Sequence, residues 1–250
     1  MQELPVWCLK IPAKIILSRL PISRRLWSNE SLMQDGDYAR GVFDTHMRRA
    51  GLSSLRGLSV LELGPGYSLL TAQNALEAGA AAVWLVDASP LADSSKIPNG
   101  AKYLTNGLQS LRKLPTSSVD FIFSHAVLEH VRRSEFEPTV RELRRLISAH
   151  GVASHVIDYQ DHLQSSLNNL RFPERLWESN FMASSGFYTN RLTFAQMLGI
   201  FRACGFKVTS TATKRWPALP LKQSSMAAPF KHLPEDELMT MGAEIATVPA

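Results

Sequence analysis

The sequence predicts an α/β protein built on a doubly wound, mostly parallel sheet. Short apolar segments recur along the chain, and segments with helical periodicity separate most of them. Consecutive strands joined through a helix pair in parallel by right-handed crossovers. A glycine-containing turn also joins the first of these strands to the helix that follows it. These three observations together predict one sheet with helices on both faces.

The composition sets the class of protein. The 250 residues suit one α/β domain or two small ones, and 45% hydrophobic with 20% charged residues is typical of a globular chain. The formal net charge of +5 is spread thinly, so we do not expect a nucleic-acid partner. Cys8 and Cys204 lack disulfide or zinc spacing, which predicts a reducing, cytoplasmic compartment.

Residues 1–35 are expected to be an N-terminal helical extension. Within them, Pro12–Leu20 begins at a proline, carries apolar residues on one face and stops at Pro21. Two interpretations stay open. The helix is either a lid packed on the domain, or residues 5–21 make a peripheral contact with the inner face of a membrane.

The main domain is expected over residues 36–250, beginning with a helix over Gly36–Arg49. The expected strands are Leu58–Leu63, Ala82–Val86, Ala101–Thr105, Val119–Ser124, Val152–Ile157, Phe206–Thr213 and Leu238–Val248. The expected helices between them are Leu69–Ala78, Pro138–Ala149 and Thr193–Ala203. No helix separates the last two strands, which suggests an antiparallel edge. The polar and aromatic residues 159–190 break the alternation and are interpreted as a substrate-side insertion.

The most specific feature is the turn Glu62-Leu-Gly-Pro-Gly66 at the end of the first strand. Glycine permits backbone angles that a side chain forbids and lets a ligand approach the main chain. Asp87, 21 residues after Gly66, ends the next strand, where a carboxylate is placed to accept hydrogen bonds from both ribose hydroxyls. A dinucleotide site would want glycine or alanine where Leu69 stands. A methionine-derived cofactor has no pyrophosphate, so the pattern favours S-adenosyl-L-methionine.

Five segments, of which this turn is the first, occur in a set order along the chain. They are Val60–Gly66 with Asp87, Leu114–Ile122, Ala126–Val131, Glu142–Gly151 and Phe201–Phe206. In this order the chain resembles the class I S-adenosylmethionine-dependent methyltransferase family over residues of about 36–213. The resemblance implies a Rossmann-like seven-stranded sheet whose last strand is antiparallel. The chain also resembles uncharacterised methyltransferases of bacterial surface-glycan clusters, which implies O-methylation of a sugar or another small hydroxylated substrate.

The resemblance also implies a set of residues around the cofactor. They are Glu62, Gly64, Gly66, Asp87, Ala88, Asn106, Gly107, Leu108 and Ser124.

Methyl transfer is an in-line displacement, so the enzyme supplies alignment and removes a proton when the nucleophile is a hydroxyl. The candidate catalytic residues lie at expected strand ends: His162 or His125 as the general base, with Asp158 beside them. Arginine can clamp an anion and aromatic rings stack on sugars. The expected substrate contacts are therefore Asp161, Arg171, Tyr188 and Arg191. A structural role stays open for each.

Several alternatives remain at this stage. The stretch Ala126–Val131 also resembles small-RNA 3′-end methyltransferases, which carry Glu-x-x-Glu-His and would imply an RNA-end methyltransferase. Ala126 stands where those enzymes have their first glutamate, so we expect no metal. A metal site formed by Glu129, His130, Asp161 and His162 stays open as an alternative. The others are a non-catalytic S-adenosylmethionine-binding regulatory or scaffold domain and a nucleotide-dependent oxidoreductase.

Overall fold

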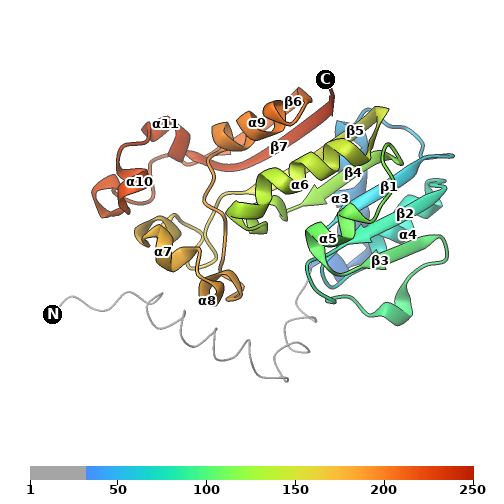
Figure 1. Ribbon diagram of the computed structural model, residues 1–250, viewed down its shortest axis with the longest axis horizontal. Helices are drawn as coiled ribbons and strands as arrows, with labels where there is room; N and C mark the ends of the chain where they lie inside the picture. The colour runs from blue at the N-terminus through green and yellow to red at the C-terminus, as the bar shows by residue number, and fades with distance from the viewer. Residues whose placement is uncertain (1–31) are drawn as a thin grey trace.

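The computed structural model describes residues 32–250 (Figure 1). The expected helix at Pro12–Leu20 and the membrane contact of residues 5–21 lie outside the described residues. No helix among the described residues is long and apolar enough to cross a membrane.

Seven strands form one sheet in the order β3-β2-β1-β4-β5-β7-β6. Their bounds are β1 Ser59–Leu63, β2 Ala82–Val86, β3 Ala101–Leu104, β4 Val119–His125, β5 Ile147–Asp158, β6 Phe206–Arg215 and β7 Thr240–Pro249. The strands β1 to β5 pair in parallel, and β7 is antiparallel to both of its neighbours. The predicted fold class, a mostly parallel seven-stranded sheet with an antiparallel last strand, is confirmed.

The expected antiparallel edge is present, since the edge strand β6 pairs antiparallel with β7, but β7 lies between β5 and β6 and the last strand is therefore not the outermost one. The side chains explain this order. In β7, Ile245, Ala246 and Thr247 are buried, which suits a strand paired on both sides. Most of β6 is exposed and polar and includes Lys207 and Lys214, as in edge strands that avoid pairing with other chains.

Helices cover both faces of the sheet. The larger ones are α3 Gly36–Arg49, α4 Leu70–Glu77, α5 Gly107–Arg112, α6 Arg133–Leu146 and α9 Phe194–Ala203. Phe43 and Met47 of α3 pack with α4 against one face, together with Phe121 and Phe123 of β4. Apolar residues of α5, α6 and α9 pack on the other face, around Ile122.

The helix expected at Pro138–Ala149 begins and ends earlier than predicted. Pro138 lies inside α6 and not at its first turn, although proline favours that position. The buried stripe of α6 instead starts at Phe136 and continues through Val140 to Leu146, so burial carries the helix through the proline. β5 then begins at Ile147, directly after α6. The six-residue helix α5 was not predicted, because it is too short to show helical periodicity.

The other helices of the described chain are short. They are η1 Leu32–Gln34, η2 Ser94–Lys96, η3 Leu128–His130, η4 Asn168–Arg171, α7 Glu174–Trp177, α8 Asn180–Ala183, η5 Gln223–Ser225, α10 Ala228–Lys231 and α11 Glu235–Leu238. Those that follow β5 and β6 gather at one end of the molecule (Figure 1). Two small apolar clusters hold them there, one around Trp177 and one around Phe230. Because β5 and β6 both end at this edge, these segments stand over the carboxyl ends of the strands.

Candidate active site at the carboxyl edge of the sheet

The glycine turn after β1 has the backbone that its sequence predicts. Gly64 has a φ of +65°, and a Cβ atom there would lie 2.4 Å from Cγ2 of Val127. Its N–H donates to the carbonyl of Val86 at 2.8 Å. Gly66 has a φ of +66°, yet nothing lies within 4 Å of where its Cβ would be. The turn therefore needs glycine at both positions and leaves open space beside Gly66.

Asp87 faces this space from the end of β2. Its Oδ2 accepts a hydrogen bond from the Gly66 N–H at 3.1 Å, and its Oδ1 accepts one from Ala88 at 2.8 Å. Burial raises the pKa of Asp87. Each carboxylate oxygen has a second lone pair, so the pair of oxygens can still accept from two adjacent hydroxyls.

The end of β3 comes to the same place. Gly107 donates its N–H to the carbonyl of Asp87 at 2.8 Å, and its φ of +47° brings it next to Ala88. Asn106 is exposed just before it, and Leu108 follows in the first turn of α5. The structure thus brings the ends of β1, β2 and β3 together, and their residues fit S-adenosylmethionine: an open glycine cradle, a carboxylate for the ribose and a neutral edge for adenine.

Glu62 lies beneath the turn. Its side chain is buried in β1, and its Oε2 accepts a hydrogen bond from the Thr71 hydroxyl of α4 at 2.6 Å. Burial raises the pKa of Glu62 to about 8, although the Thr71 hydrogen bond opposes the shift. Glu62 therefore ties β1 to the first turn of α4 and holds the glycine turn between them.

Ser124 and His125 end β4 and point to opposite faces of the sheet. Ser124 is completely buried, with its Oγ 2.7 Å from Nδ1 of His155, so its hydroxyl is engaged below the edge. His125 turns toward α3, where its Nδ1 lies 3.4 Å from Nε2 of His46. Burial and then the charge of Arg49 lower the pKa of His125.

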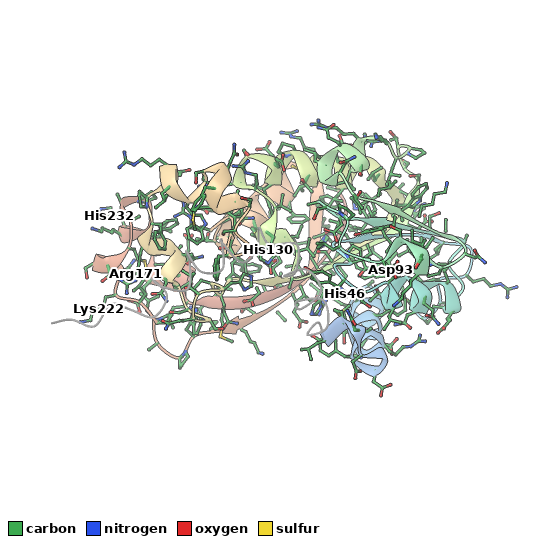
Figure 2. All side chains as sticks on the ribbon, turned by 90° about the horizontal axis from the view of Figure 1, so that it is seen from below. His46, Asp93, His130, Arg171, Lys222 and His232 are labelled. Carbon is green, nitrogen blue, oxygen red and sulfur yellow. The ribbon has the colours of Figure 1, made fainter. Side chains whose placement is uncertain are left out.

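His130 and His162 form a pair at the carboxyl edge, with His130 near the middle of the molecule (Figure 2). Their Nε2 atoms are 3.2 Å apart, and their rings are stacked with centroids 4.9 Å apart. Nδ1 of His130 lies 2.8 Å from the carbonyl oxygen of Tyr188. Desolvation by the surrounding protein, and then His162, lower the pKa of His130, while the negative charge of Asp158 opposes this. The structure therefore brings His162 and Asp158 together and places His125 elsewhere.

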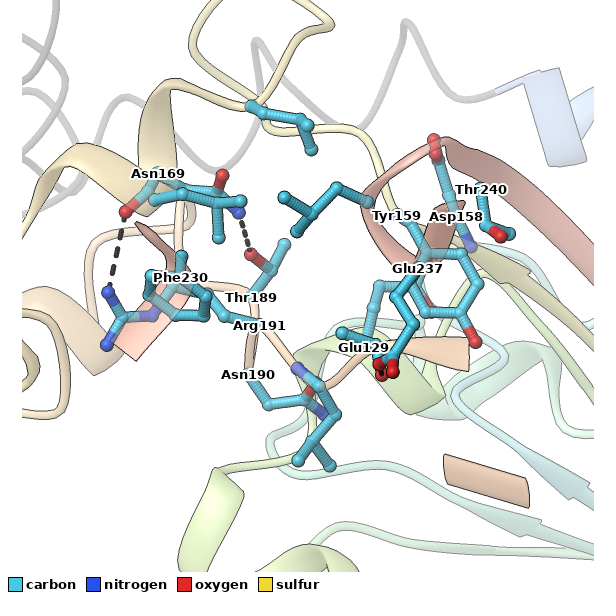
Figure 3. A pocket seen from close by; sticks show the side chains of 15 residues that line it. Glu129, Asp158, Tyr159, Asn169, Thr189, Asn190, Arg191, Phe230, Glu237 and Thr240 are labelled. Atoms are coloured by element: carbon cyan, nitrogen blue, oxygen red, sulfur yellow. Dashed lines mark hydrogen bonds between the residues drawn. The ribbon is translucent and has the colours of Figure 1, made fainter. Parts of the chain in front are cut away.

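Glu129, the residue before His130, lines a small cavity of about 40 Å³ together with Tyr159, Asn169 and Arg191 (Figure 3). Such a volume holds about one water molecule or one small polar group. Glu129 is buried; its Oε1 accepts the Asp158 N–H at 3.2 Å, and its Oε2 has no hydrogen-bond partner among the described residues. Burial raises the pKa of Glu129 to about 8.

The turn η3 links the cavity to the cofactor turn. Val127, just before it, contacts the position of Gly64, and Glu129 two residues later lines the cavity. Asn190 holds η3 in place, because its side-chain amide donates to the carbonyls of Leu128 and Val131 at 2.8 and 3.0 Å. Sequence reasoning placed Glu129 among the polar residues at strand ends and in the alternative metal cluster. It missed Asn190, since nothing in the chain order shows that residue 190 meets η3.

Asp161 organises the loop after β5 instead of facing open space. It is buried, and its carboxylate accepts hydrogen bonds from the backbone N–H groups of Leu163, Gln164, Ser166 and Asn168. Among the described residues, no three His, Cys, Asp or Glu side chains are placed to hold a metal ion.

Arg191, the second expected substrate contact, is enclosed by protein. Its guanidinium lies 5.5 Å from the Trp177 ring and 5.1 Å from the Phe230 ring, and it donates to the carbonyl of Phe172 at 2.7 Å. Burial lowers its pKa to about 10. These contacts fix the inner end of the loop, with φ of +58° at Arg191 itself.

Tyr188 and Arg171 also contact the loop itself. The Tyr188 hydroxyl donates to Glu178 at 2.8 Å and accepts the Arg133 N–H at 2.9 Å. Arg171 donates to the side chain of Asn168 and lies at the end of the molecule opposite Asp93 (Figure 2). Of the four expected substrate contacts, Tyr188 alone bonds to a member of the histidine pair, through its backbone carbonyl.

Comparisons with known proteins agree with this geometry. Residues 61–154 match the family model described as "Methyltransferase domain". No curated protein matches the chain.

Solved structures share the fold. A protein from Listeria monocytogenes assigned as an S-adenosylmethionine-dependent methyltransferase superposes with a TM-score of 0.54 at 17% identity, covering 85% of this chain and 99% of that one. One from Mesorhizobium loti gives 0.51 at 18% identity, covering 80% and 94%. The 1,6-didemethyltoxoflavin-N1-methyltransferase of Burkholderia thailandensis, with bound S-adenosylhomocysteine, gives 0.55 at 14% identity, covering 96% and 89%.

The domain match covers the glycine turn, Asp87 and the whole of β4, the segments from which the cofactor and the activity were predicted. The predicted activity is confirmed at this level, since residues 61–154 match a methyltransferase domain. The solved structures, at 14–18% identity, share the predicted fold, and one of them is described with S-adenosylhomocysteine bound.

Proposed function

We propose that this enzyme methylates a hydroxyl oxygen of a small polar molecule, such as a sugar, bound at the carboxyl edge of the sheet. The observation that carries the proposal is the His130–His162 pair; His130 follows Glu129 in the chain, and Glu129 and Asp158 both line a small cavity. A hydroxyl must lose its proton during methylation, whereas an amine need not lose one before it attacks.

We assign the cofactor to the open side of the glycine turn. Gly64 and Gly66 border its methionine part, Asp87 holds the ribose, and Ala88, Asn106, Gly107 and Leu108 border adenine. S-adenosylmethionine supplies an electrophilic methyl group on its sulfonium. Ser124 is left out of this assignment because its hydroxyl bonds to His155.

The hydrogen bonds of the histidine pair support His162 as the base. A carbonyl oxygen only accepts, so Nδ1 of His130 carries a proton and donates to Tyr188. The lowered pKa keeps His130 neutral at pH 7, so its Nε2 has a lone pair. Nε2 of His162 must then donate to it across 3.2 Å. When His162 is neutral, its lone pair therefore lies on Nδ1, and its side chain is exposed.

The proton of the acceptor hydroxyl is then removed by one nitrogen of His162. The acceptor hydroxyl gives its proton to Nδ1 of His162 as its oxygen gains the methyl group. The resulting positive charge is stabilised by the lone pair of His130 and by the nearby carboxylate of Asp158. Glu129, protonated at pH 7 because its pKa is raised, can donate its acid proton to a second hydroxyl that enters the cavity.

The Burkholderia neighbour, named as an N1-methyltransferase, gives a specific reason to test a nitrogen acceptor as the second candidate. We therefore propose to incubate the purified chain with S-adenosylmethionine and separate panels of sugars, nucleosides and amines. S-adenosylhomocysteine is measured by mass spectrometry. Turnover with sugars alone supports the hydroxyl acceptor. Turnover with amines alone, insensitive to His162→Ala, would refute it, and no turnover with any panel favours a non-catalytic binding domain.

The base assignment has a matched control. We expect His162→Ala to lower kcat by about 10²- to 10⁴-fold while the affinity for S-adenosylhomocysteine is retained. His150→Ala changes an equally exposed histidine at the opposite end of β5 and should leave both values unchanged. Full turnover in His162→Ala would remove His162 from the role of base.

A further inference from the structure

Two segments that are far apart in the sequence meet at η3. The first is the turn after β4, in which Ala126 and Val127 lead into η3. The second is the inner end of the loop after β5, formed by Asn190 and Arg191 (Figure 3). Ala126 has a φ of +53° and Arg191 a φ of +58°. They are two of the four non-glycine residues that have a positive φ in the described part of the chain.

A positive φ is unfavourable for both residues, because it brings Cβ too close to the following carbonyl oxygen. Such a conformation persists where the surrounding contacts hold it, and it is typical of functional sites. Asn190 contacts both segments. It directly precedes Arg191 in the chain, and its side chain bonds to the residues that follow Ala126. The strained backbone on the two sides of η3 therefore shares one buried polar residue.

Asn190 uses both ends of its side-chain amide. Its Nδ2 donates to the carbonyl oxygens of Leu128 at 2.8 Å and Val131 at 3.0 Å, and its Oδ1 accepts the Leu192 N–H at 3.1 Å. Its backbone N–H donates to the carbonyl of Glu129 at 2.7 Å. Asn190 is only 1% exposed, so water does not replace these bonds. Loss of the amide would leave the two carbonyls of the η3 segment without this donor.

Val127 connects η3 to the cofactor turn. A Cβ atom at Gly64 would lie 2.4 Å from Cγ2 and 2.7 Å from Cγ1 of Val127, so both methyl groups of the valine lie against the Gly64 backbone. The carbonyl of Val127 also accepts the His130 N–H at 2.9 Å, which makes it part of the η3 turn. A displacement of η3 would therefore change the contact between Val127 and the glycine turn.

We propose that Asn190 is a positioning residue for the methyl donor: it fixes η3 and so holds Val127 against Gly64, which keeps the glycine turn in the shape that accepts S-adenosylmethionine. This inference rests on the assignment of the cofactor to that turn under the proposed function. Coupling between two sites is reciprocal. A cofactor that favours this shape of the turn therefore also favours the ordered form of the loop end that carries Asn190.

The first test is the affinity for S-adenosylhomocysteine, measured by calorimetric titration of the full chain. Asn190→Ala should weaken binding about tenfold, because the hydrogen bonds that fix the binding conformation are lost. Asn169→Ala is the matched control, since Asn169 is as buried and lies in the same loop, but its amide donates to Thr189. The control should bind as the wild type does. Wild-type affinity of Asn190→Ala, or an equal loss in both variants, would overturn the proposal.

A double-mutant cycle separates positioning from a general loss of stability. Val127→Ala removes the two methyl groups through which η3 contacts the Gly64 backbone. In the Val127→Ala background, Asn190→Ala should therefore weaken S-adenosylhomocysteine binding by less than about twofold. A merely structural role of Asn190 would give the same loss in both backgrounds, and that result would refute an action through Val127.

Hydrogen exchange of the wild-type chain provides a test that needs no variant to fold. Exchange is followed by mass spectrometry with and without saturating S-adenosylhomocysteine. Peptides that contain residues 186–193 should exchange at least about threefold more slowly with the ligand, because the coupled loop end opens less often. Peptides from β6, at the edge of the sheet, should exchange at the same rate in both samples. Unchanged exchange over residues 186–193 would overturn the proposal.

Failure of the cofactor assignment gives a different result. If the glycine turn does not bind the cofactor, Asp87→Asn will bind S-adenosylhomocysteine as the wild type does, and both the assignment and this inference fail. If Asp87→Asn loses affinity while Asn190→Ala keeps it, the assignment holds and the positioning role alone is refuted.

Discussion

Replacement of Glu129 by Gln should make the enzyme more resistant to alkaline pH. The pKa of Glu129 rises from an ordinary value of 4.5 to about 8 in the folded state, chiefly by burial. Between the unfolded and the folded pKa, the folded protein holds a proton on this carboxyl that the unfolded chain has lost. The free energy of unfolding therefore decreases as the pH rises through this range. This stability is present in full below the unfolded pKa and falls away as the pH rises toward 8.

The size of the effect follows from those two pKa values. Between pH 5.5 and 8.5 the shift of Glu129 removes roughly 3 kcal/mol of unfolding free energy from the wild type, as an order of magnitude. Gln keeps the oxygen that accepts the Asp158 N–H and cannot ionise. Glu62 contributes a loss of the same sign, but it is present in both proteins and cancels in the comparison.

Urea denaturation at pH 5.5 and 8.5, followed by circular dichroism, measures the difference. We expect the wild type to lose about 3 kcal/mol more than Glu129→Gln over this interval. Glu135→Gln, at an exposed position of α6, should follow the wild type. If Glu129→Gln loses as much stability as the wild type, the carboxyl of Glu129 is ionised in the folded protein and the reasoning fails.

Three further predictions concern the cofactor site and the N-terminal segment. Gly64→Ala should destabilise the fold by about 1–3 kcal/mol, because the added Cβ would collide with Val127 and the backbone has a positive φ. The double variant with Val127→Ala should regain part of the lost melting temperature. If it regains none, the collision with Val127 is not the cause. Asp87→Asn should weaken S-adenosylhomocysteine binding about tenfold or more in calorimetric titration, because it removes a charged hydrogen-bond acceptor. The control Asp93→Asn, at an exposed turn, should bind as the wild type does. Equal affinities of Asp87→Asn and the wild type would contradict the ribose assignment. The full chain should float with anionic liposomes more than a chain without residues 1–30 if that segment contacts membranes, and equal flotation leaves the lid interpretation.

The fold and the cofactor turn were predictable because their signals are local. A buried strand, a turn that needs positive φ at Gly64 and Gly66, and an acid at the end of the next strand all lie within 30 residues of chain. Burial and backbone sterics act on each segment separately, so the pattern appears in the residue order. The boundaries of α6 were less accurate, since the local preference of Pro138 competes with the buried stripe of the whole helix.

The catalytic half was less predictable because it depends on distant contacts. The sequence singles out His125, Glu129, His130 and His162 as polar residues near strand ends. It carries no sign that the Tyr188 carbonyl orients His130, or that His46 meets His125 across 79 residues. The charge state of Glu129 likewise depends on the segments that bury it.

From sequence alone, the methyl donor, the sheet and the set of polar candidates were determined, because periodicity, glycine and a strand-end acid specify local backbone and burial. Only the tertiary structure decided that β7 lies inside the sheet and that Asp161 and Arg191 support the loop after β5. It also decided that His130 meets His162 and that His46 meets His125. Those outcomes depend on which donors and acceptors meet once the chain is packed, and hydrogen-bond direction is a property of the assembled partners rather than of any one residue.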